Sequence, residues 1–178
     1  GLDYVTEKAL ADAHNLHLGG RGVDALLVEN WEEKSNSPFV TEETKKRMEK
    51  VIDAIITEID TIVGVNVLPN DYMAALWLAR EHGLSFVQLN VYSDEARTDF
   101  THTKDVHFDV VVDPADVQKR RKGVNAALLV NIHPKEYRPL RAGANSWDEL
   151  EPITASARRA IELGADGVVV TKTTGVVP

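Results

Sequence analysis

The sequence lacks cysteine, is poor in aromatic residues and has no long hydrophobic run. None of the 178 residues is cysteine and only 6% are aromatic. Without cysteine, the chain has no disulfide bonds, thiolate metal ligands or cysteine nucleophile. The longest apolar runs, such as Gly167–Val170, are far shorter than the roughly 20 residues that span a bilayer. The sequence therefore predicts no membrane span, and its opening residues lack the basic and apolar segments of a secretory signal.

Positive charge is also scarce. The chain has 20 Lys and Arg against 28 Asp and Glu, which gives a net charge of −8. This balance disfavours long-range attraction to nucleic acid or to anionic lipid. A composition of 43% hydrophobic and 27% charged residues is that of a folded globular chain. We expect a soluble, cytoplasmic protein whose partner is a small molecule, with no nucleic acid and no membrane partner.

Short apolar runs alternate with helical patterns along the whole chain. The runs are near-continuously apolar, which is typical of parallel strands covered on both faces. They predict strands at Ala25–Val28, Ile62–Val67, Phe86–Val91, Ala126–Ile132 and Gly167–Thr171.

Helix signals lie between these runs. The clearest is an apolar stripe with helical spacing at Met48, Val51, Ile52, Ile55, Ile56 and Ile59. Another helix covers about Tyr4–Leu18, and the expected N-terminal caps are Thr41, Asn70-Asp71 and Asp113. The last long helix starts either at Ser146 or at Pro152, and the proline argues against one smooth helix. The polar stretches Thr98–Phe108 and Arg138–Asn145 are predicted as loops.

Alternation of strands and helices predicts an α/β fold with a parallel sheet. Two architectures fit, a TIM (β/α)₈ barrel and an open parallel α/β sheet such as a flavodoxin-like module, which would need a reversal of strand order. A complete barrel usually needs ~250 residues, so five strands would make an incomplete barrel. We treat residues 1–178 as a single, partial barrel domain.

A polar residue recurs at the carboxyl end of successive predicted strands. Four strands end near an asparagine, and the first also carries an acidic residue; these are Glu29, Asn30, Asn66, Asn90 and Asn131. Asparagine is depleted in strand interiors, and α/β folds bind ligands at this end of the sheet. The pattern predicts a polar ligand site, although each asparagine could instead end its strand or cap a helix.

Charged residues complete the predicted site. Glu29 and His133 are the candidate general acid and base. Lys135 and Lys172 could neutralise negative charge on a ligand, and the loop around Lys172 and Thr174 could bind an anion through its backbone. Each also has a simpler interpretation as a solvated loop residue.

No metal or cofactor motif is present. The group His102, Asp105, His107 and Asp109 invites comparison with a metal site, but its spacing does not fit one helix face and a solvated loop is the better interpretation. Arg120-Arg121-Lys122 lies at a helix C-terminus, where cations complement the helix dipole. Dinucleotide-binding, serine hydrolase and zincin motifs are absent, so the cofactor stays unknown and no metal ligand is assigned.

Several motifs in order resemble the BtpA/SgcQ family of TIM-barrel proteins. The matching segments are Gly22–Asn30, Pro38-Phe39, Gly64–Leu68 with Asn70-Asp71, Val87–Val91 with Thr98-Asp99, Val130–His133 with Lys135, and Ala165–Gly167 with Thr174-Gly175. The resemblance adds Asp99 to the candidate ligand-binding residues and supports Thr174. It implies that these segments are strands two to six of the family barrel.

The resemblance also shows departures from the family pattern. Asn131 stands where the family tends to have Asp beside the fifth-strand His133, which weakens an acid/base role built on that pair. The family's first and last two strands have no counterpart in this sequence, so it is either a truncated form of the barrel or one that a second chain, as in a homo-oligomer, could complete. The resemblance implies an enzyme acting on a small polar, phosphorylated or sugar-like metabolite, or alternatively a non-catalytic assembly factor for photosystem I.

Overall fold

Five parallel strands form the main sheet of the protein. The computed structural model describes residues 3–18, 22–31, 37–99, 107–141, 143–144 and 146–170. The strands lie in the order β1-β2-β3-β6-β8. They are β1 (Ala25–Glu29), β2 (Ile62–Asn66), β3 (Phe86–Leu89), β6 (Ala127–Ile132) and β8 (Gly167–Val170).

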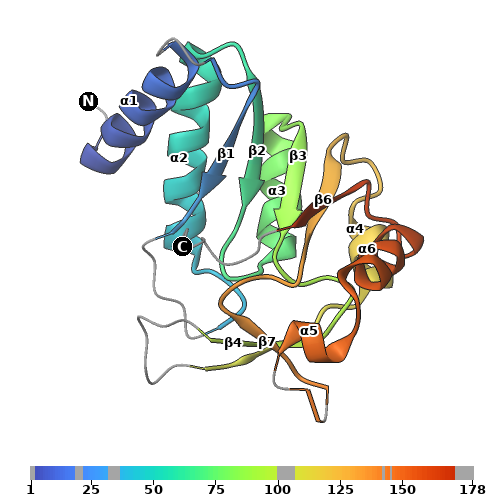
Figure 1. Cartoon of the computed structure of the whole chain (residues 1–178). Helices are drawn as coiled ribbons and strands as arrows, with labels where there is room; N and C mark the ends of the chain where they lie inside the picture. The colour runs from blue at the N-terminus through green and yellow to red at the C-terminus, as the bar shows by residue number, and fades with distance from the viewer. Residues whose placement is uncertain are drawn as a thin grey trace.

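The strand order decides between the two predicted architectures. Neighbouring strands of the main sheet follow one another along the chain, and all four pairs are parallel. A doubly wound sheet needs a reversal of strand order, and the described strands contain none. The chain therefore has the α/β winding of a TIM barrel, but the described strands leave the barrel open (Figure 1).

Helices follow the strands and pack on one face of the sheet. They are α2 (Glu42–Glu58), α3 (Tyr72–His82), α4 (Pro114–Arg120) and α6 (Ile153–Glu162), while α1 (Tyr4–Leu18) packs on α2 (Figure 1). In the described ranges no helix is both long and apolar enough to cross a bilayer.

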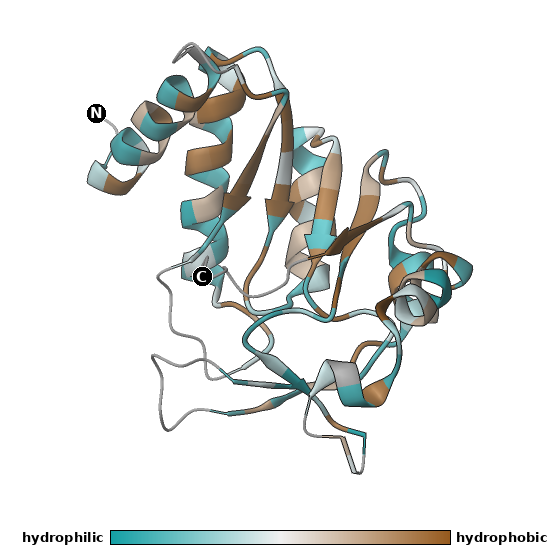
Figure 2. Ribbon diagram, viewed as in Figure 1, coloured by the Kyte–Doolittle hydropathy of each residue, from teal (hydrophilic) through white to brown (hydrophobic). Residues whose placement is uncertain are grey.

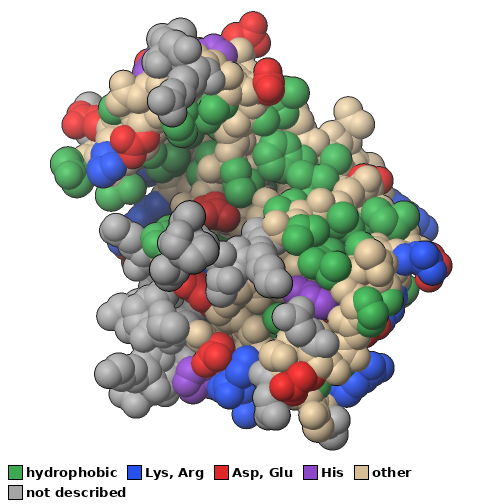
Figure 3. All heavy atoms as spheres, viewed as in Figure 1, with side chains coloured by type: hydrophobic (Ala, Val, Ile, Leu, Met, Phe, Trp, Pro, Cys, Tyr) green, Lys and Arg blue, Asp and Glu red, His purple; other side chains and the backbone are tan. Residues whose placement is uncertain are grey.

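Along each strand, side chains point alternately toward the helices and toward the opposite face of the sheet, which the helices do not cover. Val65, Leu89 and Val130 are buried beneath the helices. On the other face Leu27 is 38% exposed and Ile62 is 50% exposed. The strands are mostly hydrophobic (Figure 2), and hydrophobic side chains gather on the viewed face of the molecule (Figure 3).

The predicted helix caps are confirmed. The side chains of Thr41, Asp71 and Asp113 accept hydrogen bonds from the first turns of α2, α3 and α4. Helices follow both predicted starts: Ser146 caps the short helix α5 (Trp147–Leu150), and Pro152 is the N-cap residue of the longer α6, one position before its first helical residue. The break between them contains Glu151 in extended conformation.

A second, three-stranded antiparallel sheet lies at the carboxyl end of the main sheet (Figure 1). Its strands are β4 (Ala96–Thr98), β5 (Asp109–Val110) and β7 (Tyr137–Pro139), in the order β5-β4-β7. The prediction of loops was wrong for Thr98, which ends β4, and for Arg138 and Pro139, which belong to β7. Strands of two or three residues are too short to show a periodic pattern.

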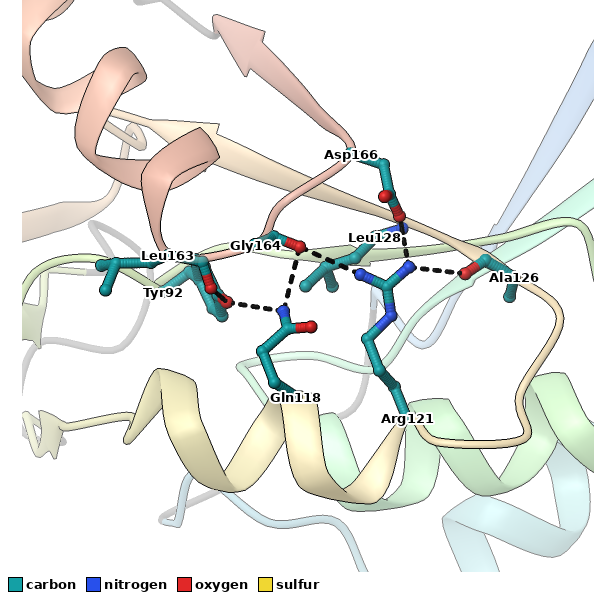
Figure 4. A network of polar contacts seen from close by, with 8 residues as sticks. All are labelled: Tyr92, Gln118, Arg121, Ala126, Leu128, Leu163, Gly164 and Asp166. Carbon is teal, nitrogen blue, oxygen red and sulfur yellow. Dashed lines mark hydrogen bonds and ion pairs between the residues drawn. The ribbon is translucent and has the colours of Figure 1, made fainter.

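The amino end of the sheet is fixed by a polar network (Figure 4). Arg121 donates to the backbone oxygens of Gly164 (3.0 Å) and Ala126 (3.2 Å) and forms an ion pair with Asp166. Gln118 also donates to the Gly164 oxygen, at 3.0 Å. Arg121 thus ties the loops before β6 and β8 to α4, which is a more specific role than the helix-dipole interaction predicted for it.

Candidate functional site

A row of hydrogen-bonded polar side chains crosses the carboxyl ends of four neighbouring strands. We call it the strand-end cluster; it consists of Glu29, Asn66, Gln88, Asn90 and Asn131. Asn66 donates through Nδ2 to Glu29 Oε1 (2.8 Å) and to Asn90 Oδ1 (3.3 Å). Asn131 donates to the same Asn90 oxygen at 2.7 Å, and Gln88 donates to Asn131 Oδ1 at 3.1 Å. Parallel pairing causes this alignment, since Glu29 is in register with Asn66.

One backbone carbonyl sets the direction of the amides in the cluster. Asn90 Nδ2 donates to the oxygen of Pro69 at 3.1 Å, and a carbonyl oxygen can only accept. Asn90 Oδ1 must therefore be the acceptor for the amide nitrogens of Asn66 and Asn131. Asn66 in turn directs its nitrogen to Glu29, and its own oxygen is buried without a hydrogen-bond partner in the described structure. At this end the cluster therefore presents two hydrogen-bond acceptors, the Glu29 carboxylate and Asn66 Oδ1.

Two residues that sequence reasoning missed support Asn90. The hydroxyl of Tyr137 donates to the Pro69 oxygen (2.7 Å) and accepts from Asn90 Nδ2 (3.2 Å). Burial raises the pKa of Tyr137 far above its ordinary value, so the hydroxyl keeps its proton. Asn70 Oδ1 accepts from the backbone nitrogens of Asn90 and Val91, each at 2.9 Å. The sequence placed Asn70 at a helix start, but only the residue after it caps the helix.

Asn30 lies outside the cluster and braces the backbone. Its Nδ2 donates to the Leu68 oxygen (3.0 Å), and its Oδ1 accepts from the Leu68 nitrogen (2.7 Å). Both ends of the amide are thus bonded to the loop after β2. This geometry favours a structural role over the predicted role in ligand binding.

His133 follows Asn131 at the end of β6 and belongs to a separate network. Its backbone has φ 52°, which is uncommon for a residue with a side chain and recurs at functional sites. The ring stacks on Trp147, with centroids 5.6 Å apart and planes at 14°. Nε2 lies 3.0 Å from Oγ of Ser156, a side chain with no exposed surface.

Ser156 connects His133 to a half-buried ion pair. Its hydroxyl lies 2.5 Å from Glu151 Oε1. Arg159 donates to Glu151 Oε2 at 2.9 Å and to Asp94 at 2.5 Å. The hydrogen bond from Arg159 lowers the pKa of Glu151, so this carboxylate is ionised at neutral pH. We call Asp94, His133, Glu151, Ser156 and Arg159 the histidine network.

The other predicted site residues lie at the rim or elsewhere. Lys135 is exposed, with Nζ 5.8 Å from the centroid of the Trp31 ring. Asp99 forms an ion pair with Arg138 (3.2 Å) beside the second sheet, away from the hydrogen bonds that define the strand-end cluster. Lys172 and Thr174 lie outside the described residues, as do His102 and Asp105. In the part of the chain that the structure describes, no three His, Asp or Glu side chains lie close enough together to hold a metal ion.

The structure thus brings Glu29, Asn66, Asn90 and Asn131 into contact and places His133 at the same end of the sheet. The cluster offers an exposed carboxylate, and the histidine network offers a ring held by stacking and by a hydrogen bond. This arrangement can accept hydrogen bonds from a polar ligand and exchange a proton with it. The assignment of these residues to catalysis or binding stays a prediction.

Comparison with known proteins identifies relatives for half of the chain or more. The photosystem I biogenesis protein BtpA of Synechocystis is 27% identical over 173 residues, covering 94% of this chain and 54% of that protein. An uncharacterised protein of Thermococcus kodakarensis, TK2179, is 37% identical over 98 residues, which is 55% of this chain and 37% of the relative. An uncharacterised protein of Archaeoglobus fulgidus is 35% identical over 89 residues, covering 50% of this chain and 35% of the relative. The chain therefore covers about half of the BtpA protein and about a third of the archaeal relatives.

Among solved structures, a dihydropteroate synthase from Coxiella burnetii in complex with pteroic acid aligns with 94% of this chain and 78% of that chain. The TM-score is 0.34 and the sequence identity is 12%. The sequence profile of the BtpA family matches residues 1–178. The chain belongs to the BtpA family.

Proposed function

We propose that this chain carries acid/base chemistry on a small polar metabolite at the carboxyl end of its parallel sheet. The observation that supports the proposal most is the continuous hydrogen-bonded row from Glu29 through Asn66 and Asn90 to Asn131. Side chains from four strands are held in one orientation there, as precise substrate positioning requires.

The donors and acceptors of the site define the ligand chemistry. Glu29 presents a carboxylate, which accepts hydrogen bonds and repels anions. A ligand group at this position must therefore donate hydrogen bonds, as a hydroxyl does. A phosphate on the same ligand would lie toward the exposed cation Lys135 instead. Glu29 and His133 exchange protons with the substrate, and Asn66, Asn90 and Asn131 keep the site in shape.

The alternative is a non-catalytic role in assembly or stability of a larger complex. It draws on the name of the Synechocystis relative, a photosystem I biogenesis protein. It also draws on the open sheet, whose exposed Leu27 and Ile62 offer apolar surface to another protein. In that case the polar residues at the strand ends would stabilise the fold without binding a metabolite.

A thermal-shift screen distinguishes the two functions. The panel contains polyols, sugars, sugar phosphates, nucleotides and divalent metal ions, and the variants are Glu29→Gln and His133→Ala. A ligand at 100 times its Kd stabilises the folded state by about 2.7 kcal/mol, which raises Tm by roughly 5–10 °C for a chain of this size.

We expect such a shift in the wild type, and in the control Glu81→Gln on the exposed end of α3, but not in the two site variants. A panel that shifts no variant, together with retention of a partner protein in pull-down, would support the assembly role. Equal shifts in the wild type and both site variants would place the ligand elsewhere.

A further inference from the structure

Trp31, two residues after Glu29, is a tryptophan that the fold leaves in solvent. It is 55% exposed, whereas the other two tryptophans, Trp77 and Trp147, pack against the hydrophobic core. A tryptophan side chain can bury roughly 150–250 Å² of surface. Trp31 therefore contributes much less to the stability of the fold than its size allows.

Lys135 lies over this exposed ring although it comes from a distant strand end. Its Nζ is 5.8 Å from the centroid of the Trp31 ring, within the range of a cation–π contact. Trp31 follows β1 and Lys135 follows β6, and β2 and β3 lie between these two strands in the sheet. Three strand spacings amount to about 14 Å. The two side chains thus meet across the same four strand ends that carry the strand-end cluster.

The turn that presents Lys135 is strained and braced. His133 (φ 52°) and Glu136 (φ 66°), on either side of it, both have left-handed backbone, which is uncommon for residues with a side chain. Trp147 donates from Nε1 to the Pro134 oxygen at 3.1 Å. Backbone strain persists only where the surrounding structure enforces it, and it is concentrated at active sites and ligand clamps. The fold thus holds this cation in place at a cost in backbone energy.

The other half of the pair is braced as well. Asn30, directly before Trp31, bonds to both backbone groups of Leu68, at 3.0 and 2.7 Å. These bonds tie the end of β1 to the loop after β2 and so fix the point from which the indole projects. The exposed ring and the exposed cation are therefore both presented by backbone that is held by hydrogen bonds, as a preorganised binding site requires.

We propose that Trp31 and Lys135 form a clamp for a cyclic, anionic ligand, in which the indole face packs on the ring of the ligand and the ammonium group pairs with its negative group. This inference rests on the proposed function and names its substrate class. A flat indole makes most contact with another ring, and a lysine binds phosphate or carboxylate as a point charge. Because Glu29 accepts hydrogen bonds, the ring carries hydroxyl groups. The class is a sugar or cyclic polyol with one anionic substituent.

The short distance within the clamp limits the ligand further. A ring in van der Waals contact with the indole lies about 3.5–4 Å from it. An Nζ that is 5.8 Å from the indole centroid then reaches an anionic group on that ring or on its first substituent. A nucleotide separates its base from its phosphate by a whole ribose, and an open-chain polyol phosphate has no ring to pack. Both should bind more weakly than a cyclic sugar phosphate.

The test is ligand binding to the whole chain, measured by thermal shift and by tryptophan fluorescence. The cyclic probes are glucose 6-phosphate, glucuronate and myo-inositol 1-phosphate. The comparators are sorbitol 6-phosphate, which is the open-chain counterpart of the first probe, AMP, uncharged glucose and inorganic phosphate. We expect a cyclic anion to change the fluorescence of Trp31 saturably and to bind about tenfold more tightly than every comparator.

Variants separate the ring contact from the charge contact. Trp31→Ala should weaken binding about tenfold, whereas Trp31→Phe keeps a flat ring and should retain most of the affinity while losing the fluorescence change. Lys135→Met should weaken binding about 10- to 100-fold. The matched control is Lys45→Met, because Lys45 lies 4.5 Å from the centroid of Trp77, between α2 and α3, and its loss should leave binding unchanged. Since Trp31 and Lys135 are exposed, their variants should keep the Tm of the ligand-free chain.

Three outcomes would overturn the clamp: no binding of any cyclic anion, binding of sorbitol 6-phosphate or AMP as tight as that of the cyclic probes, or wild-type affinity in Trp31→Ala. The proposed function fails separately. A ligand that needs Glu29 and His133 but binds equally well to Trp31→Ala would retain the acid/base site and reject the clamp. A cyclic anion that needs Trp31 but binds equally well to Glu29→Gln and His133→Ala would retain the clamp and reject the acid/base site.

Discussion

Asn90 offers the sharpest test of the strand-end cluster, because Asn90→Asp replaces the amide nitrogen, a hydrogen-bond donor, with a carboxylate oxygen, an acceptor. The nitrogen of Asn90 faces the oxygens of Pro69 (3.1 Å) and Tyr137 (3.2 Å). In the aspartate variant an acceptor oxygen takes its place, and the Tyr137 hydrogen is already donated to Pro69. The variant therefore loses two hydrogen bonds and places a negative charge where the side chain is only 6% exposed.

The cost follows from these contacts. Two net hydrogen bonds contribute about 2 kcal/mol, and burial of a charge whose partners are all neutral adds to that. We expect Asn90→Asp to lower the free energy of unfolding by about 3–5 kcal/mol at pH 7. With a denaturant slope of ~2 kcal/mol/M, the midpoint in urea falls by about 1.5–2.5 M.

The sign of the pH dependence distinguishes the effect of the added charge from the effect of the lost hydrogen bonds. Burial raises the pKa of the new carboxyl in the folded state above its unfolded value, so the destabilisation is largest at high pH and decreases as the pH falls. Protonation also restores a donor toward Pro69. We expect Asn90→Asp to regain about 1–3 kcal/mol relative to the wild type between pH 7 and pH 4, measured by urea unfolding.

The matched control is Asn90→Ala, which removes the side-chain hydrogen bonds without adding charge. It should be destabilised by about 2–4 kcal/mol, with a pH dependence parallel to that of the wild type. If Asn90→Asp were as stable as the wild type, or followed the pH profile of the alanine variant, the direction assigned to the amides would be wrong.

Three more substitutions test other contacts. Glu151→Gln removes a carboxylate whose pKa is held low by Arg159, and the stabilisation that this pair provides is present above the unfolded-state pKa and lost as the pH falls. The variant should therefore have a free energy of unfolding about 1–3 kcal/mol below that of the wild type at pH 7, and urea titrations should show this difference closing on acidification. A difference that stays constant with pH would contradict the prediction. Gly64→Ala places a Cβ 2.3 Å from the Phe86 ring and should cost about 1–3 kcal/mol, most of which Phe86→Ala relieves in a double-mutant cycle; additive effects would refute the clash. Gly164→Ala combines φ +98° with a 2.8 Å approach to a glutamine of α4, and should lower Tm by several degrees in a melting scan; an unchanged Tm would exclude that strain.

Local signals in the sequence predicted most of the main sheet and its helices. Caps at Thr41, Asp71 and Asp113 depend on residues within three positions of the helix start, so they can be read directly. The order of the strands could not be read in this way, because an open doubly wound sheet and a partial barrel share the same alternation. Long-range pairing between the strands decided that question.

The site was predictable in composition but not in detail. Because parallel strands bring their carboxyl ends together, Glu29, Asn66 and Asn131 could be expected at one edge. The amide directions could not, since they depend on the backbone oxygen of Pro69, which carries no sequence signal. Ser156 was invisible for a related reason: it lies 23 residues from His133, on a different element.

The asparagines of the site divide into two kinds, and the division bears on function. Asn30 and Asn70 bond to loop backbone, and their substitution would loosen the loops. Asn66 and Asn90 bond to other side chains in a row that ends on Glu29. In such a row each amide fixes the next, so a change at Asn90 alters the hydrogen bond that Glu29 receives although the two side chains do not touch. Loss of ligand binding in Asn90→Ala, without loss in Asn30→Ala, would show that the row positions the carboxylate.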